Sequence, residues 1–172
     1  LTESSPLRPH GPKGRARKAG AELLMRAHEQ GQVQVAIGRA ADFYGPGIDY
    51  PNLKLLFGNA VEGKTVRLLG SGEALHSVSF IKDVGHALVT LTENDSAFGD
   101  VWHLPVAPPM PEKELVRRIV DLAGTGATIA STPAWAVHAL FKVMGLFSPM
   151  MRELPEVQYQ HELPFVVDDS RF

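Results

Sequence analysis

The stretch LHSVSFIKDVGHALVTL, residues 75–91, holds a strand pattern that runs directly into a helix pattern. In its first half His76, Val78 and Phe80 recur at every second position, so we expect a strand over 75–81. In its second half Asp83 can cap a helix whose apolar face is formed by Val84, Ala87, Leu88 and Leu91. This succession predicts a strand–helix unit, the building block of an α/β fold.

Helix and strand patterns alternate along the rest of the chain as well. Helical spacing predicts helices over 13–30, 53–60, 111–123 and 135–146. Short strands are expected over 33–37, 66–69, 101–104 and 128–131, with a loop over 42–47 and an extended, packed tail from Ser148 onward. The core stripe expected for the first helix is Ala16, Ala19, Gly20, Leu23 and Ala27. The predicted fold class is therefore α/β.

Length and composition exclude several classes of protein. The chain has 172 residues, about one domain, with 44% hydrophobic and 21% charged residues, which is ordinary for a folded soluble protein. A net charge of −2 gives no global basic field for nucleic acid or an anionic membrane. The absence of cysteine excludes disulfides, a thiolate zinc site and a cysteine nucleophile, and suits a reducing cytoplasm.

The ends and the apolar segments show no targeting signal. The apolar stretch 134–151 contains His138, Lys142 and Pro149, so we do not expect it to span a membrane. The chain begins Leu-Thr-Glu-Ser-Ser-Pro without an initiator methionine, and we expect it to be a piece of a longer protein.

Local motifs give few sites of chemistry on their own. Gly70-x-Gly72 follows a strand, but Leu75 stands where a dinucleotide fingerprint needs glycine or alanine, so we interpret it as a turn. The seven histidines lack metal-ligand spacing, and no metal site is predicted. The cations at 13, 15, 17 and 18 mark either an anion-binding site or a solvated face. His76 points into either the core or a pocket.

Three segments in this order resemble a known family. They are KAGAELL at 18–24, VAIGRAADFYGPG at 35–47 and HSVSFIKDV at 76–84. Together they resemble the extended short-chain dehydrogenase/reductases, and most of all their NAD-dependent epimerase/dehydratase group. WHLP at 102–105 and PFVVDDSR at 164–171 resemble segments of atypical members of the same group. The resemblance implies the C-terminal part of a Rossmann-like fold with its smaller substrate lobe, and NAD or NADP as cofactor.

The same resemblance implies roles for individual residues. Lys18 matches the lysine that holds the nicotinamide ribose, but the tyrosine that precedes it by four in the family is Gly14 here. The backbone near Ala40 would approach the nicotinamide, and Asp42 stands where an asparagine often touches substrate. We take Tyr44 in the same loop as the candidate proton donor.

His76 stands where enzymes of nucleotide sugars often carry an arginine for the diphosphate. A neutral imidazole cannot replace a bidentate guanidinium, so His76 and Asp42 point to a substrate that is not a nucleotide sugar. By resemblance, residues 1–47 would end the cofactor domain and residues 48–172 would form mainly the substrate lobe with returning segments. The glycine-rich half would lie outside this chain.

Three functions follow as hypotheses. The first is an NAD(P)-dependent epimerase/dehydratase-like oxidoreductase or isomerase of a small carbonyl or hydroxyl substrate. The second is a non-catalytic dinucleotide sensor or scaffold on the same fold, which would explain Gly14. The third is a partner-binding module that uses the surface from Trp135 to Met151. The expected partner is a small molecule, with no nucleic acid and no membrane, and a homodimer is the candidate assembly.

Overall fold

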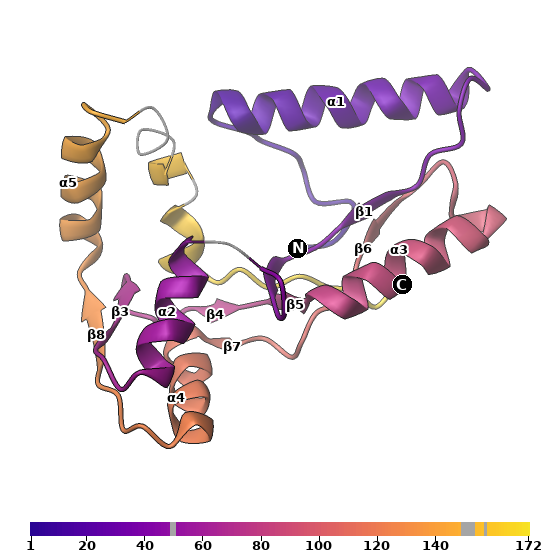
Figure 1. The fold of residues 1–172 in the computed structure, drawn as a ribbon. Coiled ribbons are helices and arrows are strands. Elements are labelled where there is room, and N and C mark those ends of the chain that lie inside the picture. Colours follow the sequence, from indigo (N-terminus) through magenta and orange to yellow (C-terminus); the bar gives the residue numbers. More distant parts are fainter. Residues whose placement is uncertain (49–50, 149–153, 157) are drawn as a thin grey trace. The chain divides into compact units, whose positions relative to one another are not determined.

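Helices and short strands alternate along the chain (Figure 1). A computed structural model describes residues 1–48, 51–148, 154–156 and 158–172. The helices are α1 (Pro12–Glu29), α2 (Pro51–Val61), α3 (Ile81–Glu93), α4 (Glu112–Ala123) and α5 (Ala134–Met144), with 3-10 helices η1 (Asp95–Ala97), η2 (Leu154–Glu156) and η3 (Gln158–His161). The strands are β1 (Ile37–Arg39), β2 (Asp42–Tyr44), β3 (Val66–Leu69), β4 (Leu75–His76), β5 (Val78–Phe80), β6 (Val101–His103), β7 (Met110–Pro111) and β8 (Ile129–Thr132).

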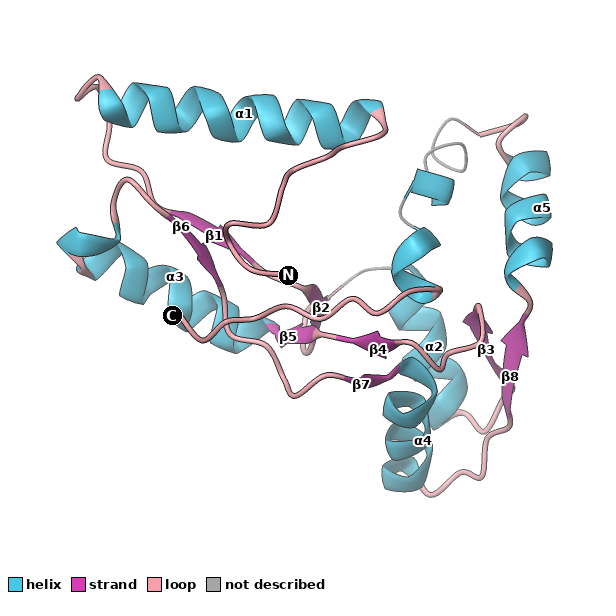
Figure 2. Cartoon of the chain, turned by 180° about the vertical axis from the view of Figure 1, so that it is seen from behind, coloured by secondary structure: helices cyan, strands magenta, loops and turns pink. Residues whose placement is uncertain are grey.

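The strands pair two by two, and three of the four pairs are parallel. These are β1 with β6, β2 with β5, and β3 with β8, whereas β4 and β7 are antiparallel. Parallel partners need a crossover between them, and helices of this chain lie in those connections. The predicted α/β class is confirmed, and Figure 2 shows the strands as short pieces among the helices.

The chain divides into two compact units, each assembled from separate segments. The first unit holds residues 1–45, 78–107 and 167–172, and the second holds residues 46–77 and 108–166. In the first, α3 packs its buried face with η1 and the end of β6, through Val84, Ala87, Leu91, Ala97 and Leu104. In the second, α2, β3 and α4 enclose a core of Ala60, Val66, Leu68, Val116, Val120 and Ala127.

Helix positions agree well with the sequence patterns, but strand limits agree less. Strand β1 begins at Ile37, so the strand expected over 33–37 is wrong for all but its last residue. Residues 42–44 of the expected loop form β2, because they find a parallel partner in β5. The expected strand 75–81 is divided into β4 and β5, and Ile81 already begins α3. The expected extended tail contains η2 and η3.

Helix α1 lies where expected, but its predicted core stripe is wrong. None of its residues is buried, and Leu23 is 61% exposed. The half-covered residues are Gly14, Lys18, Ala21, Met25, Ala27 and His28, most of them one helical face. The period identifies the helix, but which face is covered depends on the segments beside it. Lys18 therefore lies on the more covered side of α1.

No helix among the described residues combines the length and the apolar character that crossing a bilayer requires.

Candidate functional site

Strand β2 places two of the predicted site residues on one face. Asp42 pairs with Val78 and Tyr44 pairs with Phe80 across the parallel β2–β5 ladder. Residues two apart in a strand point to the same side, so the carboxylate and the phenol share a face. The neighbouring Ala41 is buried, and its N–H donates to Ser79 Oγ at 3.3 Å, while that hydroxyl donates to Pro105 O at 3.0 Å. A buried serine thus fixes the backbone that presents Asp42.

Tyr44 is held against the neighbouring strand by its ring. The ring centroids of Tyr44 and Phe80 are 5.3 Å apart, with 42° between the planes. Such tilted aromatic contacts are favourable beyond their buried area. Gly45 follows with φ +125°, and a Cβ there would lie 2.8 Å from Phe80 Cε2. Only glycine permits this approach, so Gly45 and Phe80 together set the position of the phenol.

Ala40 lies between β1 and β2 and packs, partly buried, against the core of the first unit. Its neighbour Arg39 accepts a backbone hydrogen bond at its carbonyl from the N–H of Leu104 at 2.9 Å. The backbone at Ala40 is therefore fixed by strand pairing on one side and by the core on the other.

Lys18 belongs to the same unit and is half-exposed. Its Nζ lies 3.4 Å from Leu7 O and 3.8 Å from Glu22 Oε1, one turn further along α1. An ammonium has three N–H donors, and these two described contacts are long, so the group can still engage a hydroxyl. Gly14 lies one turn before Lys18 on the same face and contributes no functional group.

His76 lies in the second unit, in a cluster of rings. Its ring is stacked on His161 at 6.0 Å and tilted against Phe165 at 5.1 Å. Its Nδ1 lies 3.2 Å from Gln160 O, and His161 Nδ1 lies 3.3 Å from Glu112 Oε2. The strand position predicted for His76 is confirmed, and its neighbours come from the segment 160–165.

The structure therefore brings Asp42 and Tyr44 together on β2, beside Ala40. Lys18 belongs to the same unit on α1, and its described contacts are with Leu7 and Glu22. His76 belongs to the other unit, so it is described by its own surroundings alone.

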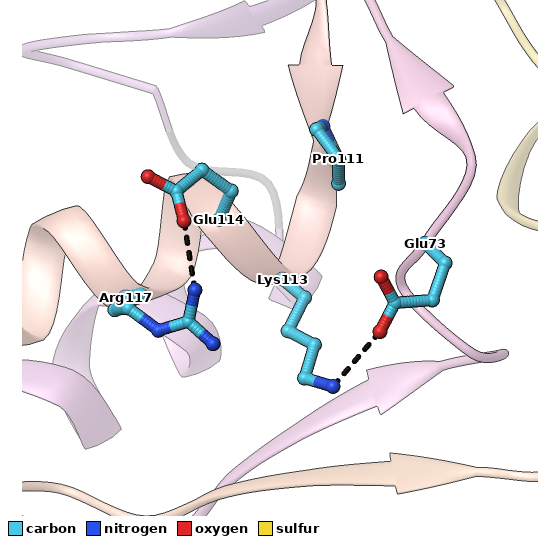
Figure 3. Close-up of a pocket in the computed structure, with 5 residues that line it drawn as sticks. All are labelled: Glu73, Pro111, Lys113, Glu114 and Arg117. Atoms are coloured by element: carbon cyan, nitrogen blue, oxygen red, sulfur yellow. Dashed lines mark hydrogen bonds and ion pairs between the residues drawn. The ribbon is translucent and has the colours of Figure 1, made fainter.

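A hollow of about 300 Å³ lies in the second unit, where β7 leads into α4. Its lining is Glu73, Pro111, Lys113, Glu114 and Arg117, and Figure 3 shows the charged side chains paired. Lys113 Nζ lies 2.8 Å from Glu73 and Arg117 lies 2.8 Å from Glu114. Hydrogen bonds from Arg118 and Arg117 lower the pKa of Glu114. Equal numbers of acids and bases leave no surplus charge for an ionic ligand.

A second set of polar contacts in the first unit surrounds His103, which is buried. The His103 N–H donates to Glu3 Oε1 at 3.0 Å, and the ring Nδ1 lies 2.9 Å from Asp168 O. That hydrogen bond from the His103 backbone lowers the pKa of Glu3. A neighbouring N–H, that of Val106, donates to Asp169 Oδ2 at 2.9 Å.

Sequence reasoning missed Ser79, which supports the loop before Asp42, and also Gln160 and His161 beside His76. The alternation over 75–81 put Ser79 on the polar face opposite His76 and Val78, which favours exposure, whereas the structure buries Ser79. The contacts of 160–161 had no signal either, because that segment has no period. No group of three or more metal-ligating side chains occurs within the described ranges of the chain.

Comparison with known proteins gives a consistent set of relatives. A model of the NAD dependent epimerase/dehydratase family matches residues 1–104. A dTDP-glucose 4,6-dehydratase of Streptomyces niveus is 27% identical over 126 residues, 72% of this chain and 37% of that protein. A 2'-dehydrokanamycin reductase of Streptomyces kanamyceticus is 29% identical over 145 residues, 81% of this chain and 41% of that protein.

Solved structures agree with these sequence matches. A dTDP-glucose 4,6-dehydratase of Streptomyces venezuelae, determined with NAD bound, superposes with a TM-score of 0.62 at 27% identity, over 77% of this chain and 42% of that one. The chain spans 37% to 47% of the length of the curated relatives it matches.

Proposed function

Because the chain belongs to the NAD-dependent epimerase/dehydratase family, we propose that the protein is an NAD(P)-dependent oxidoreductase of a small carbonyl or hydroxyl substrate. The observation that carries this proposal is the shared face of Asp42 and Tyr44 on β2. Ligands of α/β folds bind at the carboxyl ends of parallel strands, and Tyr44 is the last residue of β2.

In this proposal each residue has a separate task. Tyr44 donates a proton to, or accepts one from, the substrate oxygen, and its contact with Phe80 limits the directions that its hydroxyl can take. Asp42, on the same face, accepts a hydrogen bond from a substrate hydroxyl and so orients the reacting carbon. Gly14 has no hydroxyl to take part, so the phenol on β2 is the proton donor of this scheme.

The residues present fit one end of the cofactor. The half-exposed ammonium of Lys18 can hold a ribose hydroxyl, and the fixed backbone at Ala40 can lie against the nicotinamide. A pyrophosphate needs a glycine-rich loop at a helix N-terminus, and Gly70-Ser71-Gly72 leads into β4, not into a helix. When bound, the nicotinamide supplies or accepts a hydride.

We further propose that the substrate is not a nucleotide sugar. His76 gives one imidazole in place of a guanidinium, and that imidazole lies against His161 and Gln160. The relatives include one named for a dTDP-linked glucose and one named for 2'-dehydrokanamycin. His76 favours a substrate without a diphosphate, such as a glycoside ketone.

On the lack of cysteine alone, we place the protein in the cytoplasm.

One observation favours a second candidate, a non-catalytic protein that senses the dinucleotide. Gly14 removes the hydroxyl on which the family's proton transfer depends. Nicotinamide absorbance separates the two candidates when the full-length protein is mixed with NAD(P)H and a panel of ketones and keto-sugars. Turnover that falls about 10²–10⁴-fold in Tyr44→Phe, with unchanged cofactor binding, supports the enzyme. Cofactor binding without turnover of any compound in the panel favours the sensor.

A further inference from the structure

Helix α5 and the turn after it expose an unusual amount of apolar surface. Only Val137 and Phe141 of the helix are buried. Trp135 is 75% exposed, Val143 is 57% exposed and Phe147 is 86% exposed. Both views show α5 at the margin of its unit, with η2 on one side (Figures 1 and 2). Residues 149–151, the end of the surface expected from the sequence, lie outside the described residues.

The centre of the exposed side is a narrow stripe. Trp135, Ala139 and Val143 are spaced by four and lie opposite Val137 and Phe141, so they form one line along the helix. We call these three residues the α5 stripe. Its middle residue is small, which lets a second helix approach closely between the larger side chains at either end.

Two basic side chains lie along one edge of the α5 stripe. They are His138 and Lys142, which are one helical turn apart. His138 Nε2 lies 2.9 Å from Glu162 Oε1. Residues 134–148 contain no carboxylate, so Glu162 brings the negative charge to this edge and Lys142 brings the positive charge.

We propose that the α5 stripe is an interface with a second copy of this chain, in which the two α5 helices pack antiparallel about a two-fold axis at Ala139. In that arrangement Trp135 of each copy packs on Val143 of the other. The two-fold axis leaves the charged edges of both helices on the same side. Each Lys142 then lies beside His138 of the other copy, offset by about 3 Å along the helix.

Charge complementarity is what selects a second copy as the occupant. Each Lys142 reaches the Glu162 carboxylate that accompanies the opposite His138, so two equivalent ion pairs form at once. A parallel two-fold pairing would put the two charged edges on opposite sides of the interface, so that neither Lys142 would face the Glu162 carboxylate of the other copy. An anionic membrane surface favours helices with several cations on the polar face, whereas α5 has one lysine, and His138 on the same edge contacts the Glu162 carboxylate. The interface is independent of the proposed activity.

The expected dimer is weak. Two helices of this length cover less than the ~800 Å² that each partner gives to a standard interface. We expect a concentration-dependent equilibrium, measurable by analytical ultracentrifugation of the 172-residue chain. Val143→Asp should raise the dimer dissociation constant at least about tenfold, because it buries a charge in the stripe. Leu122→Asp is the matched control, since Leu122 is 90% exposed on α4 and should leave the equilibrium unchanged.

A charge exchange tests the arrangement itself. Lys142→Glu should weaken the dimer about three- to tenfold, and Lys142→Glu combined with Glu162→Lys should recover the affinity. Circular dichroism of each variant reports whether it is folded. A wild-type chain that stays monomeric at every concentration, a dimer insensitive to Val143→Asp, or no recovery in the folded double variant would overturn the proposal. Recruitment of the monomer to phosphatidylserine vesicles, lost in Val143→Asp, would also overturn it by assigning the stripe to a membrane.

Discussion

The imidazole rings of His76 and His161 lie parallel, with centroids 6.0 Å apart and 9° between their planes. His76 is on β4 and His161 ends η3, so the stack joins two segments far apart in the sequence. The His76 side chain is held against its neighbours in this stack and offers a ligand a single imidazole. For this reason we do not expect His76 to bind a diphosphate.

The first prediction concerns Asp42 and His76, the two substrate-site residues that depart from the family pattern. Gly14→Tyr in the full-length protein should not by itself produce turnover of dTDP-glucose, because Asp42 and His76 still mismatch a diphosphate-bearing ligand. Product analysis with that substrate checks it. Robust turnover by the single variant would show that His76 matters less than proposed.

Lys18 gives the second prediction. Lys18→Ala in the full-length protein should cost about 1.5–3 kcal/mol of NAD(P)H affinity, as expected for hydrogen bonds to a charged group. The melting temperature should change little, since the pair with Glu22 is exposed and worth at most about 0.5 kcal/mol. NAD(P)H fluorescence titration measures the affinity, and Lys13→Ala on the exposed part of the same helix is the control. Equal dissociation constants for Lys18→Ala and wild type would show that Lys18 is a solvated residue that does not bind the cofactor.

The third prediction concerns the 172-residue chain alone. Its sequence contains no Gly-x-Gly-x-x-Gly/Ala fingerprint, the motif that provides most of the contacts to a pyrophosphate in dinucleotide-binding folds. We therefore expect no micromolar binding of NAD(P)H to this chain in calorimetry. Binding at that level would mean that another segment holds the pyrophosphate.

Gly45 gives a prediction about the support of Tyr44. Gly45→Ala should destabilise the chain by about 1–3 kcal/mol, because the added methyl meets Phe80 and the backbone has a positive φ. Gly85→Ala is the control, since its Cβ meets nothing within 4 Å in the interior of α3 and should be neutral or stabilising. Urea unfolding of both variants gives the comparison, and equal stabilities would contradict the close contact.

The last prediction follows from Glu3 and His103. Folding lowers the pKa of Glu3 below its ordinary value of 4.5, so its contribution is present above that pH and is lost as the pH falls through the lower, folded value. Glu3→Gln should cost about 1 kcal/mol near neutral pH, after allowance for solvent screening. The difference from wild type should shrink below pH 4.5. Thermal melts across this range measure it, and a difference that does not change with pH would exclude the charge as its cause.

The sequence predicts the helices of this fold better than its strands. Leu56 and Ala60 repeat at helical spacing, and this local spacing is enough to predict α2. Strand β2 has no such local cause, because Asp42–Tyr44 becomes a strand only by pairing with Val78–Phe80. The candidate site divides in the same way. Asp42 and Tyr44 could be named from their motif, but Ser79 and His161 reach their neighbours through pairings that no period encodes.

The interleaved segments of the two units set the order in which they can form during synthesis. The second unit is complete once residue 166 has left the ribosome, whereas the first unit still lacks residues 167–172. Asp168 and Asp169 bind His103 and Val106, so these contacts can form only after the whole second unit has been synthesised. The segment with α1 and β1, although synthesised before the second unit, therefore completes its contacts after it.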